Sequence, residues 1–95
     1  MPTYERTDRF DRDWRALTDA QRKRFRAAVR RFVSDLKTGH FRAGLRVRGI
    51  TGAEGIFEMT WAPDGRATFE YGRGRGDGPH VIWRRIGTHD IFGQP

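Results

Sequence analysis

The spacing of apolar residues changes once along this 95-residue chain, from a helical period in the first half to a period of two in the second. Thr18 and Gln21 form the pattern of a helix capping box, and Gly39 is a natural helix end. Between them, apolar residues recur at steps of three and four: Phe25, Ala28, Val29, Phe32, Val33 and Leu36. We therefore expect one long amphipathic helix, preceded by a shorter helix that carries Phe10 and Trp14.

After Gly44 the alternation of apolar and polar residues is typical of strands. The segments expected to form strands are 45–48, 56–61, 66–71 and 81–86. Residues 62–65 should form a turn in which Pro63 presets φ and Gly65 takes a positive φ, and the glycine-rich Gly72–Pro79 should be a loop. The chain is thus expected to be a single α+β domain over residues 1–95. Its sheet should be mostly antiparallel, with about four strands and two N-terminal helices packed on one face.

The composition favours a nucleic-acid partner. The formal charge is +7, and all the basic residues except Lys23 and Lys37 are arginine, whose planar group of donors matches phosphate. A GC-rich coding sequence would explain the arginine bias but not the net charge. The helix arginines leave two alternatives open, a solvated face or contact with phosphate or an acidic partner. Because no cysteine, membrane-length apolar run or signal peptide is visible, we expect a cytoplasmic protein that does not enter a membrane.

Strand alternation sorts the second half of the chain into two faces. Phe57, Met59 and Trp61 form an apolar set that should point toward the helices. Polar and charged residues should share the opposite, open face: Arg46, Arg48, Glu58, Thr60, Arg66, Thr68 and Glu70. His89 follows the end of the last strand and is placed to reach the rim of this face.

These side chains are the groups needed to cleave an RNA phosphodiester without a metal. An imidazole transfers protons near working pH, guanidinium groups stabilise charge on phosphate oxygens, and a carboxylate can act as a base. The simpler alternative is a solvent face on which arginine and glutamate pair across strands. That alternative predicts balanced charge, whereas arginines outnumber acids here. Since His40, His80 and His89 lack metal-ligand spacing, no metal or cofactor is expected.

The order of these elements resembles the RelE/ParE superfamily of toxins from bacterial type II toxin–antitoxin systems. The motifs that carry the resemblance are Gly55–Glu58 in a hairpin, its closure through Asp64–Arg66, and the terminal Arg85–His89. The resemblance extends from about Phe10 to Phe92. It implies a small sheet with two N-terminal helices packed on it. RelE/YoeB-like members cut mRNA without a metal, usually in the ribosomal A site, whereas ParE-like members poison DNA gyrase.

The resemblance also implies roles for individual residues. Arg66 stands where the family has a phosphate-stabilising arginine, and His89 stands where the YoeB-like branch has a histidine acid. Glu58 is either a base or only a strand residue, because RelE has a basic residue at that position. Further arginines are expected to bind RNA phosphates: Arg46, Arg48, Arg84 and Arg85.

The expected function is therefore that of a toxin that inhibits translation as an mRNA endonuclease. Attack by the 2′-hydroxyl would leave a 2′,3′-cyclic phosphate and a 5′-hydroxyl. The expected partners are mRNA, the ribosomal A site and a cognate antitoxin. The alternative is a gyrase inhibitor or a nucleic-acid-binding module with the same fold.

Overall fold

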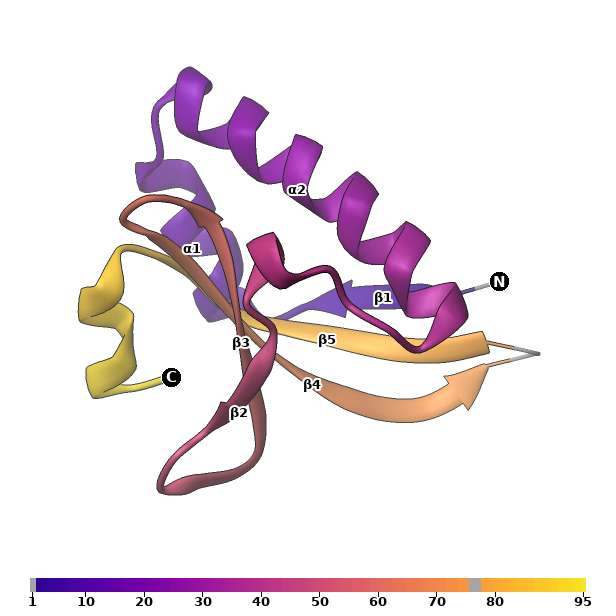
Figure 1. Cartoon of the computed structure of the whole chain (residues 1–95). Coiled ribbons are helices and arrows are strands. Elements are labelled where there is room, and N and C mark those ends of the chain that lie inside the picture. The colour runs from indigo at the N-terminus through magenta and orange to yellow at the C-terminus, as the bar shows by residue number, and fades with distance from the viewer. Residues whose placement is uncertain (1, 76–77) are drawn as a thin grey trace.

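Two helices cover one face of a five-stranded sheet (Figure 1). The computed structural model describes residues 2–75 and 78–95. The elements in chain order are β1 (Thr3–Arg6), α1 (Asp8–Ala16), α2 (Asp19–Thr38), the 3₁₀ turn η1 (Ala43–Leu45), β2 (Arg48–Ile50), β3 (Ala53–Ala62), β4 (Gly65–Arg75), β5 (Gly78–Gly87) and the 3₁₀ turn η2 (His89–Gly93). The α+β prediction is confirmed, although the sheet has five strands instead of about four.

Local capping signals fix the ends of both helices. The Thr7 side chain accepts a hydrogen bond from the Phe10 amide and opens α1. Thr18 and Gln21 form the predicted capping box, with bonds of 3.1 and 2.8 Å. Gly39 ends α2 in a left-handed conformation with φ of 79°. The predicted capping box and the predicted end at Gly39 are confirmed. Each cap depends only on neighbouring residues.

The core is aromatic and lies between α2 and the sheet. Phe32 of α2 has its ring centroid 5.1 Å from that of Phe69 and 5.3 Å from that of Trp83. Phe25, about two turns earlier on the same face of α2, has its ring centroid 5.4 Å from that of Trp83 in an edge-to-face arrangement. Met59 is fully buried on the same side of the sheet. The predicted apolar face of the strands therefore packs on the helices.

The sheet order is β1-β5-β4-β3-β2, with one parallel pair. β1 runs parallel to β5, from Thr3 opposite His80 to Arg6 opposite Trp83, and the other neighbours are antiparallel. β4 and β5 shift register, since Thr68 pairs with Arg85 while the next residue, Phe69, pairs with Trp83. Arg84 is therefore the extra residue of a β-bulge, which breaks the simple alternation of faces along β5.

The predicted strand over residues 45–48 is wrong. Residues 43–45 form the 3₁₀ turn η1, Arg46 has a left-handed φ of 48°, and β2 begins only at Arg48. The turn brings Leu45 into the core, where 1% of the side chain is exposed. Burial of this leucine therefore sets the local conformation, and it overrides the alternation.

The predicted loop over Gly72–Pro79 is also wrong in the described part, while residues 76–77 lie outside it. β4 continues through Arg75 and β5 begins at Gly78. Gly72 serves close packing here, since a Cβ atom would lie 2.8 Å from the Cδ2 of its pairing partner His80.

Gly65 also allows close packing. The predicted turn joins β3 to β4, but Gly65 is not among the described residues with positive φ. A Cβ atom at Gly65 would lie 2.6 Å from the Trp61 ring, so the glycine allows the ring to cross the hairpin. In the described part of the chain, no helix has the length and apolar character needed to cross a membrane.

Candidate active site

His89 is an exposed side chain on the turn that follows β5. Thr88 caps this turn by accepting a hydrogen bond from the Asp90 amide at 3.4 Å. The His89 ring meets the ring of Phe92 at 90°, with 4.7 Å between the centroids. The turn η2 therefore holds an accessible imidazole and an aromatic ring side by side at the end of the sheet.

Arg66 lies on the neighbouring strand β4, opposite Gly87. Gly87 is two residues before His89 in the chain. Its Nη1 atom donates to carbonyl oxygens of the β3–β4 turn, at 2.9 Å to Gly65 and 3.3 Å to Ala62. None of the described carboxylates forms an ion pair with Arg66. The guanidinium is thus held by neutral groups and keeps its charge available, and in the described part of the chain no hydrogen bond joins it to His89.

Glu58 does not lie on an open face, so this part of the prediction is wrong. Only 6% of Glu58 is exposed, and its Oε1 atom accepts a 2.7 Å hydrogen bond from Nε of Arg48. The two residues are directly opposite each other in the β2–β3 pair. Thr68, predicted on the same open face, is fully buried as well. Cross-strand pairing, and not solvent, therefore surrounds the Glu58 carboxylate.

Arg84 and Arg85 are brought together by the bulge, but both are paired with acids. Nη1 of Arg84 lies 2.8 Å from Glu70. Arg85 contacts Asp13 of α1 through two nitrogens, at 2.6 and 3.2 Å. Of the predicted phosphate-binding arginines, Arg46 is exposed and has no ion pair with a described residue.

The C-terminal segment lies against the same two arginines. The Arg84 Nε donates to the Pro95 carbonyl at 3.2 Å, and the Arg85 Nη1 donates to the Gln94 carbonyl at 2.9 Å. Arg9 of α1 adds a third guanidinium, at 3.5 Å from the Gln94 side chain. These residues line part of an open pocket of about 480 Å³. In this pocket the guanidinium groups already contact oxygen acceptors.

Asp13 and the C-terminal segment were missed by the sequence analysis. Asp13 lies 72 residues from Arg85 in the chain, and its carboxylate also accepts the Ile86 amide at 3.2 Å. No periodic pattern links positions so distant. The sequence predicted more arginines than acidic residues on one face, but it left out Asp13, which comes from a helix. The prediction therefore overstated the number of arginines without an ion pair on that face.

No group of three or more metal-ligating side chains is found in the described ranges 2–75 and 78–95. His80 is buried, with its Nδ1 atom 2.7 Å from the Thr3 hydroxyl. His80 thus ties β1 to β5, and among the three histidines His40 and His89 are the exposed ones.

Comparisons by sequence found no matching family model and no matching curated protein. Solved structures do match. A chain of the Escherichia coli DinJ–YafQ complex superposes with a TM-score of 0.67 and 14% identity, covering 96% of this chain and 97% of that chain. For the RelB–RelE antitoxin–toxin complex from Methanococcus jannaschii the values are 0.62 and 16%, with 93% of each chain covered.

A third structure, the YoeB/ParE toxin from Agrobacterium tumefaciens, gives a TM-score of 0.67 and 13% identity over 92% of this chain and 98% of that chain. The TM-scores establish that the fold is shared, whereas identities this low leave the activity open. Since the match spans nearly the whole length of each relative, the architecture is shared from the first strand to the last. The chain therefore has the fold of the RelE/ParE toxins.

Proposed function

We propose that this chain is the toxin of a type II toxin–antitoxin system and that it cleaves mRNA without a metal. The observation that carries the proposal is the position of His89, an exposed imidazole at the end of β5, beside Phe92 and across from the strand of Arg66. The fold match supports it, because the matched structures include antitoxin–toxin complexes. An imidazole at the end of one strand, next to the strand that carries a guanidinium without an ion pair to the described residues, suits proton transfer beside a phosphate.

In the proposed mechanism the substrate's 2′-hydroxyl gives its proton to a water molecule, its oxygen bonds to the adjacent phosphorus, and the bond from phosphorus to the 5′-oxygen breaks. Arg66 stabilises the charge that develops on the phosphate oxygens, and His89 as general acid protonates the departing 5′-oxygen. Phe92 stacks on a base beside the scissile bond. The products are a 2′,3′-cyclic phosphate and a 5′-hydroxyl.

In this proposal Glu58 is not the general base. Its carboxylate is buried and bound to Arg48, so it would have to leave that ion pair to reach a substrate. We assign Glu58 to holding Arg48 in place, so that Arg48 and Arg46 can contact RNA phosphates. The proposed partners are mRNA, the ribosomal A site and a cognate antitoxin.

The test is to induce the chain in cells and to map RNA 5′ ends. His89→Gln and Arg66→Ala should each reduce cleavage by about a hundredfold or more, while the proteins remain folded. His40→Ala is the matched control, because His40 is also exposed but follows α2. Cleavage by His89→Gln at the parental rate would remove His89 as the acid.

One observation favours a second candidate, a ParE-like inhibitor of DNA gyrase. Three of the predicted phosphate-binding arginines are paired with acids: Arg48, Arg84 and Arg85. Their pairing weakens the electrostatic attraction expected for RNA. This candidate predicts growth arrest that tolerates loss of His89, no new RNA ends, and direct inhibition of purified gyrase.

A further inference from the structure

We propose that Asp13 of α1 is a positioning residue for the candidate active site, and that it fixes the turn η2 and with it the imidazole of His89. Asp13 reaches the start of this turn through the main chain at Ile86, and it reaches the end through the side chain of Arg85. Its effect on RNA cleavage rests on the proposed function, whereas the contacts that hold the turn do not.

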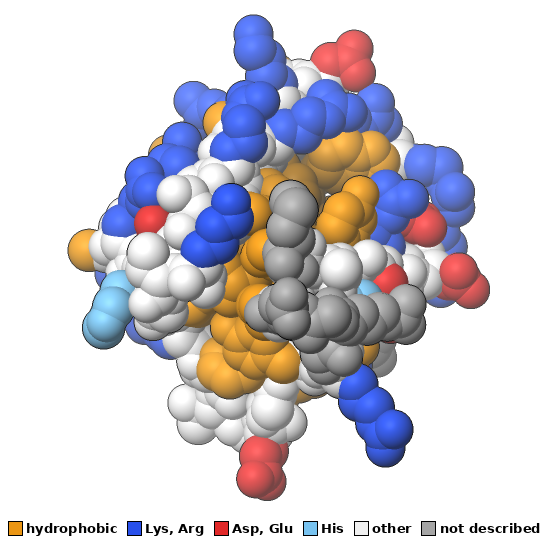
Figure 2. Space-filling view, turned by 90° about the vertical axis from the view of Figure 1, so that its right-hand side faces the viewer, with side chains coloured by type: hydrophobic (Ala, Val, Ile, Leu, Met, Phe, Trp, Pro, Cys, Tyr) orange, Lys and Arg blue, Asp and Glu red, His pale blue; other side chains and the backbone are white. Residues whose placement is uncertain are grey.

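The carboxylate of Asp13 grips the guanidinium of Arg85 with both oxygens. Oδ2 accepts from Nε at 2.6 Å, and Oδ1 accepts from Nη2 at 3.2 Å. Only 15% of the Asp13 side chain and 14% of the Arg85 side chain are exposed, whereas many other Lys and Arg side chains extend from the surface (Figure 2). A two-pronged contact between planar groups fixes orientation as well as distance. Asp13 therefore determines where this guanidinium lies.

The same carboxylate binds the main chain of β5 beyond the end of β1. There β5 lies against α1 instead of a neighbouring strand. The hydroxyl of Thr7, the residue that caps α1, donates to the Arg84 carbonyl at 2.9 Å. Oδ2 of Asp13 accepts from the Ile86 amide at 3.2 Å. Since Ile86 is three residues before His89, this contact fixes the direction in which the chain enters the turn.

Arg85 carries the contact to the far end of the turn. Its Nη1 atom donates to the Gln94 carbonyl at 2.9 Å. The Gln94 amide in turn donates to the carbonyl of Ile91, a residue that is 5% exposed. His89 and Phe92 lie between the two ends that are held. The turn is therefore fixed where the chain enters it and where the chain leaves it.

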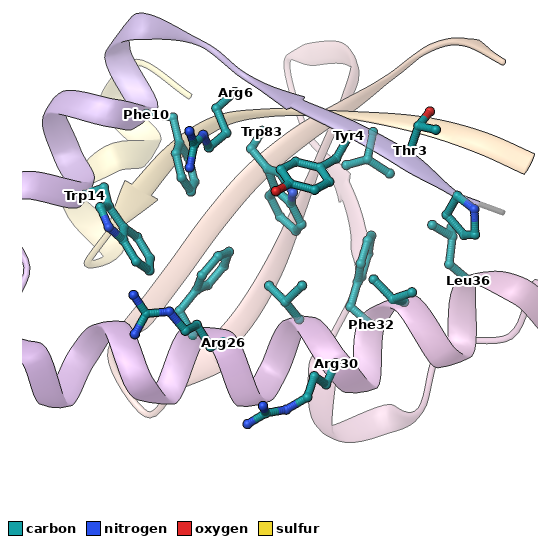
Figure 3. Close-up of a pocket in the computed structure, with 15 residues that line it drawn as sticks. Thr3, Tyr4, Arg6, Phe10, Trp14, Arg26, Arg30, Phe32, Leu36 and Trp83 are labelled. Carbon is teal, nitrogen blue, oxygen red and sulfur yellow. The ribbon is translucent and has the colours of Figure 1, made fainter. Parts of the chain in front are cut away.

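Helix α1 is a rigid support for this carboxylate. Phe10 and Trp14 point from α1 toward α2 (Figure 3). Phe10 is 2% exposed, and its ring centroid lies 6.0 Å from that of Phe25 and 6.3 Å from that of Trp83. Because these contacts fix the rotation of α1, they also fix the position of Asp13, three residues after Phe10. A side chain on a packed helix is a more precise support than one on a loop.

A direct contact with the RNA phosphate is the competing role for Arg85. Its Nε, Nη1 and Nη2 atoms each already donate to Asp13 or to Gln94. A phosphate would have to replace one of these acceptors, so the geometry favours Arg85 as the link between α1 and the turn. The two roles differ in kinetics. Loss of a positioning contact lowers kcat, whereas loss of a phosphate contact raises KM.

The first measurement is steady-state cleavage of an mRNA on purified ribosomes. Asp13→Asn keeps the size of the side chain but turns an NH2 group toward hydrogen-bond donors. Its kcat should fall at least about tenfold, because small misplacements of a reacting group cost this much or more, and its KM should stay within about twofold. Arg85→Lys keeps the charge but loses the two-pronged contact, and it should lower kcat in the same way. Asp11→Asn is the matched control, since Asp11 lies on the same helix but pairs with Arg6 at 3.3 Å; both constants should match those of the parent.

NMR supplies a measurement that needs no cleavage. The His89 and Phe92 rings meet at 90° with 4.7 Å between their centroids. In the parent, the two rings should therefore show nuclear Overhauser effects to each other, and the His89 signals should be displaced by the ring current of Phe92. Asp13→Asn and Arg85→Lys should weaken both signals while the core resonances stay those of the folded protein. Asp11→Asn should preserve both.

The proposal is overturned if Asp13→Asn and Arg85→Lys leave the signals between His89 and Phe92 unchanged. It is also overturned if kcat stays at the parental value, and a rise in KM alone would make Arg85 a phosphate ligand. If Asp13→Asn does not fold, Arg85→Lys decides, because it breaks the same link from the other side. A parent that does not cut RNA would remove the proposed function, and the NMR comparison would still decide whether Asp13 holds the turn.

Discussion

Replacing Gly65 with alanine should destabilise the protein by about 1–3 kcal/mol, the usual cost of overpacking a core. The new Cβ atom would lie 2.6 Å from two carbons of the Trp61 ring, and ordinary van der Waals contact begins at 3.4 Å. The ring would have to withdraw by most of an ångström. It cannot do so freely, because only 7% of Trp61 is exposed and Phe25 packs edge-on against it at 6.2 Å.

The assay is urea unfolding of the parent and the variant. With an m-value of about 1 kcal/mol/M, the midpoint should fall by roughly 1–3 M. Gly49→Ala is the control, since its Cβ atom would meet nothing within 4 Å and Gly49 has no positive φ. That variant should stay within about 0.5 kcal/mol of the parent.

A double-mutant cycle with Trp61→Phe tests the cause. If the alanine at position 65 acts by crowding this ring, removing part of the ring should make the two penalties less than additive. Additive penalties, or a Gly65→Ala protein as stable as the parent, would refute the packing argument. Because the Gly65 carbonyl accepts from Arg66 at 2.9 Å, the same variant should also disturb the position of Arg66.

Three further predictions concern stability. Hydrogen bonds from Arg42 lower the pKa of Asp35 from 3.8 to about 2. The stability that this pair contributes is therefore complete at pH values above the unperturbed pKa and is lost as the pH falls through the lowered pKa. The urea midpoints of Arg42→Ala and of the parent should converge between about pH 4 and pH 2. Arg48→Gln should lower the free energy of unfolding by about 1–2 kcal/mol in urea, because it leaves the buried Glu58 carboxylate without its ion-pair partner, and this loss should be smaller in a Glu58→Gln background. Phe32→Ala should cost about 3–5 kcal/mol in the same assay, and a smaller loss would contradict its central place in the core.

The parts of the fold that follow local rules could be predicted from the sequence. The capping box at Thr18 and the left-handed end at Gly39 each depend on a few adjacent residues. The apolar face that includes Met59 follows from the period of two alone. The left-handed conformation of Arg46 could not be predicted, because it depends on Leu45 entering a core formed by distant segments.

The candidate site was less predictable than the fold. Alternation along β5 assumed an unbroken strand, whereas the bulge at Arg84 brings two consecutive arginines to the same C-terminal segment. The acid that pairs with Arg85 comes from α1, and no spacing in the sequence connects Asp13 with the last strand. Burial of Glu58 likewise depends on its partner across β2 and β3. Which charged groups remain available is therefore a property of tertiary contacts.

The parallel pair of β1 and β5 determines the order in which the chain can fold. Each residue of β1 meets a partner 77 positions later, so during synthesis the first strand emerges long before β5 exists. Helices α1 and α2 can form early, because their contacts are local, but the sheet closes only after the last strand has left the ribosome. His89 follows that strand directly, so its turn gains a folded support only once β5 has been synthesised and paired. A nascent chain that lacks β5 is therefore expected to leave the His89 turn without its support in the fold.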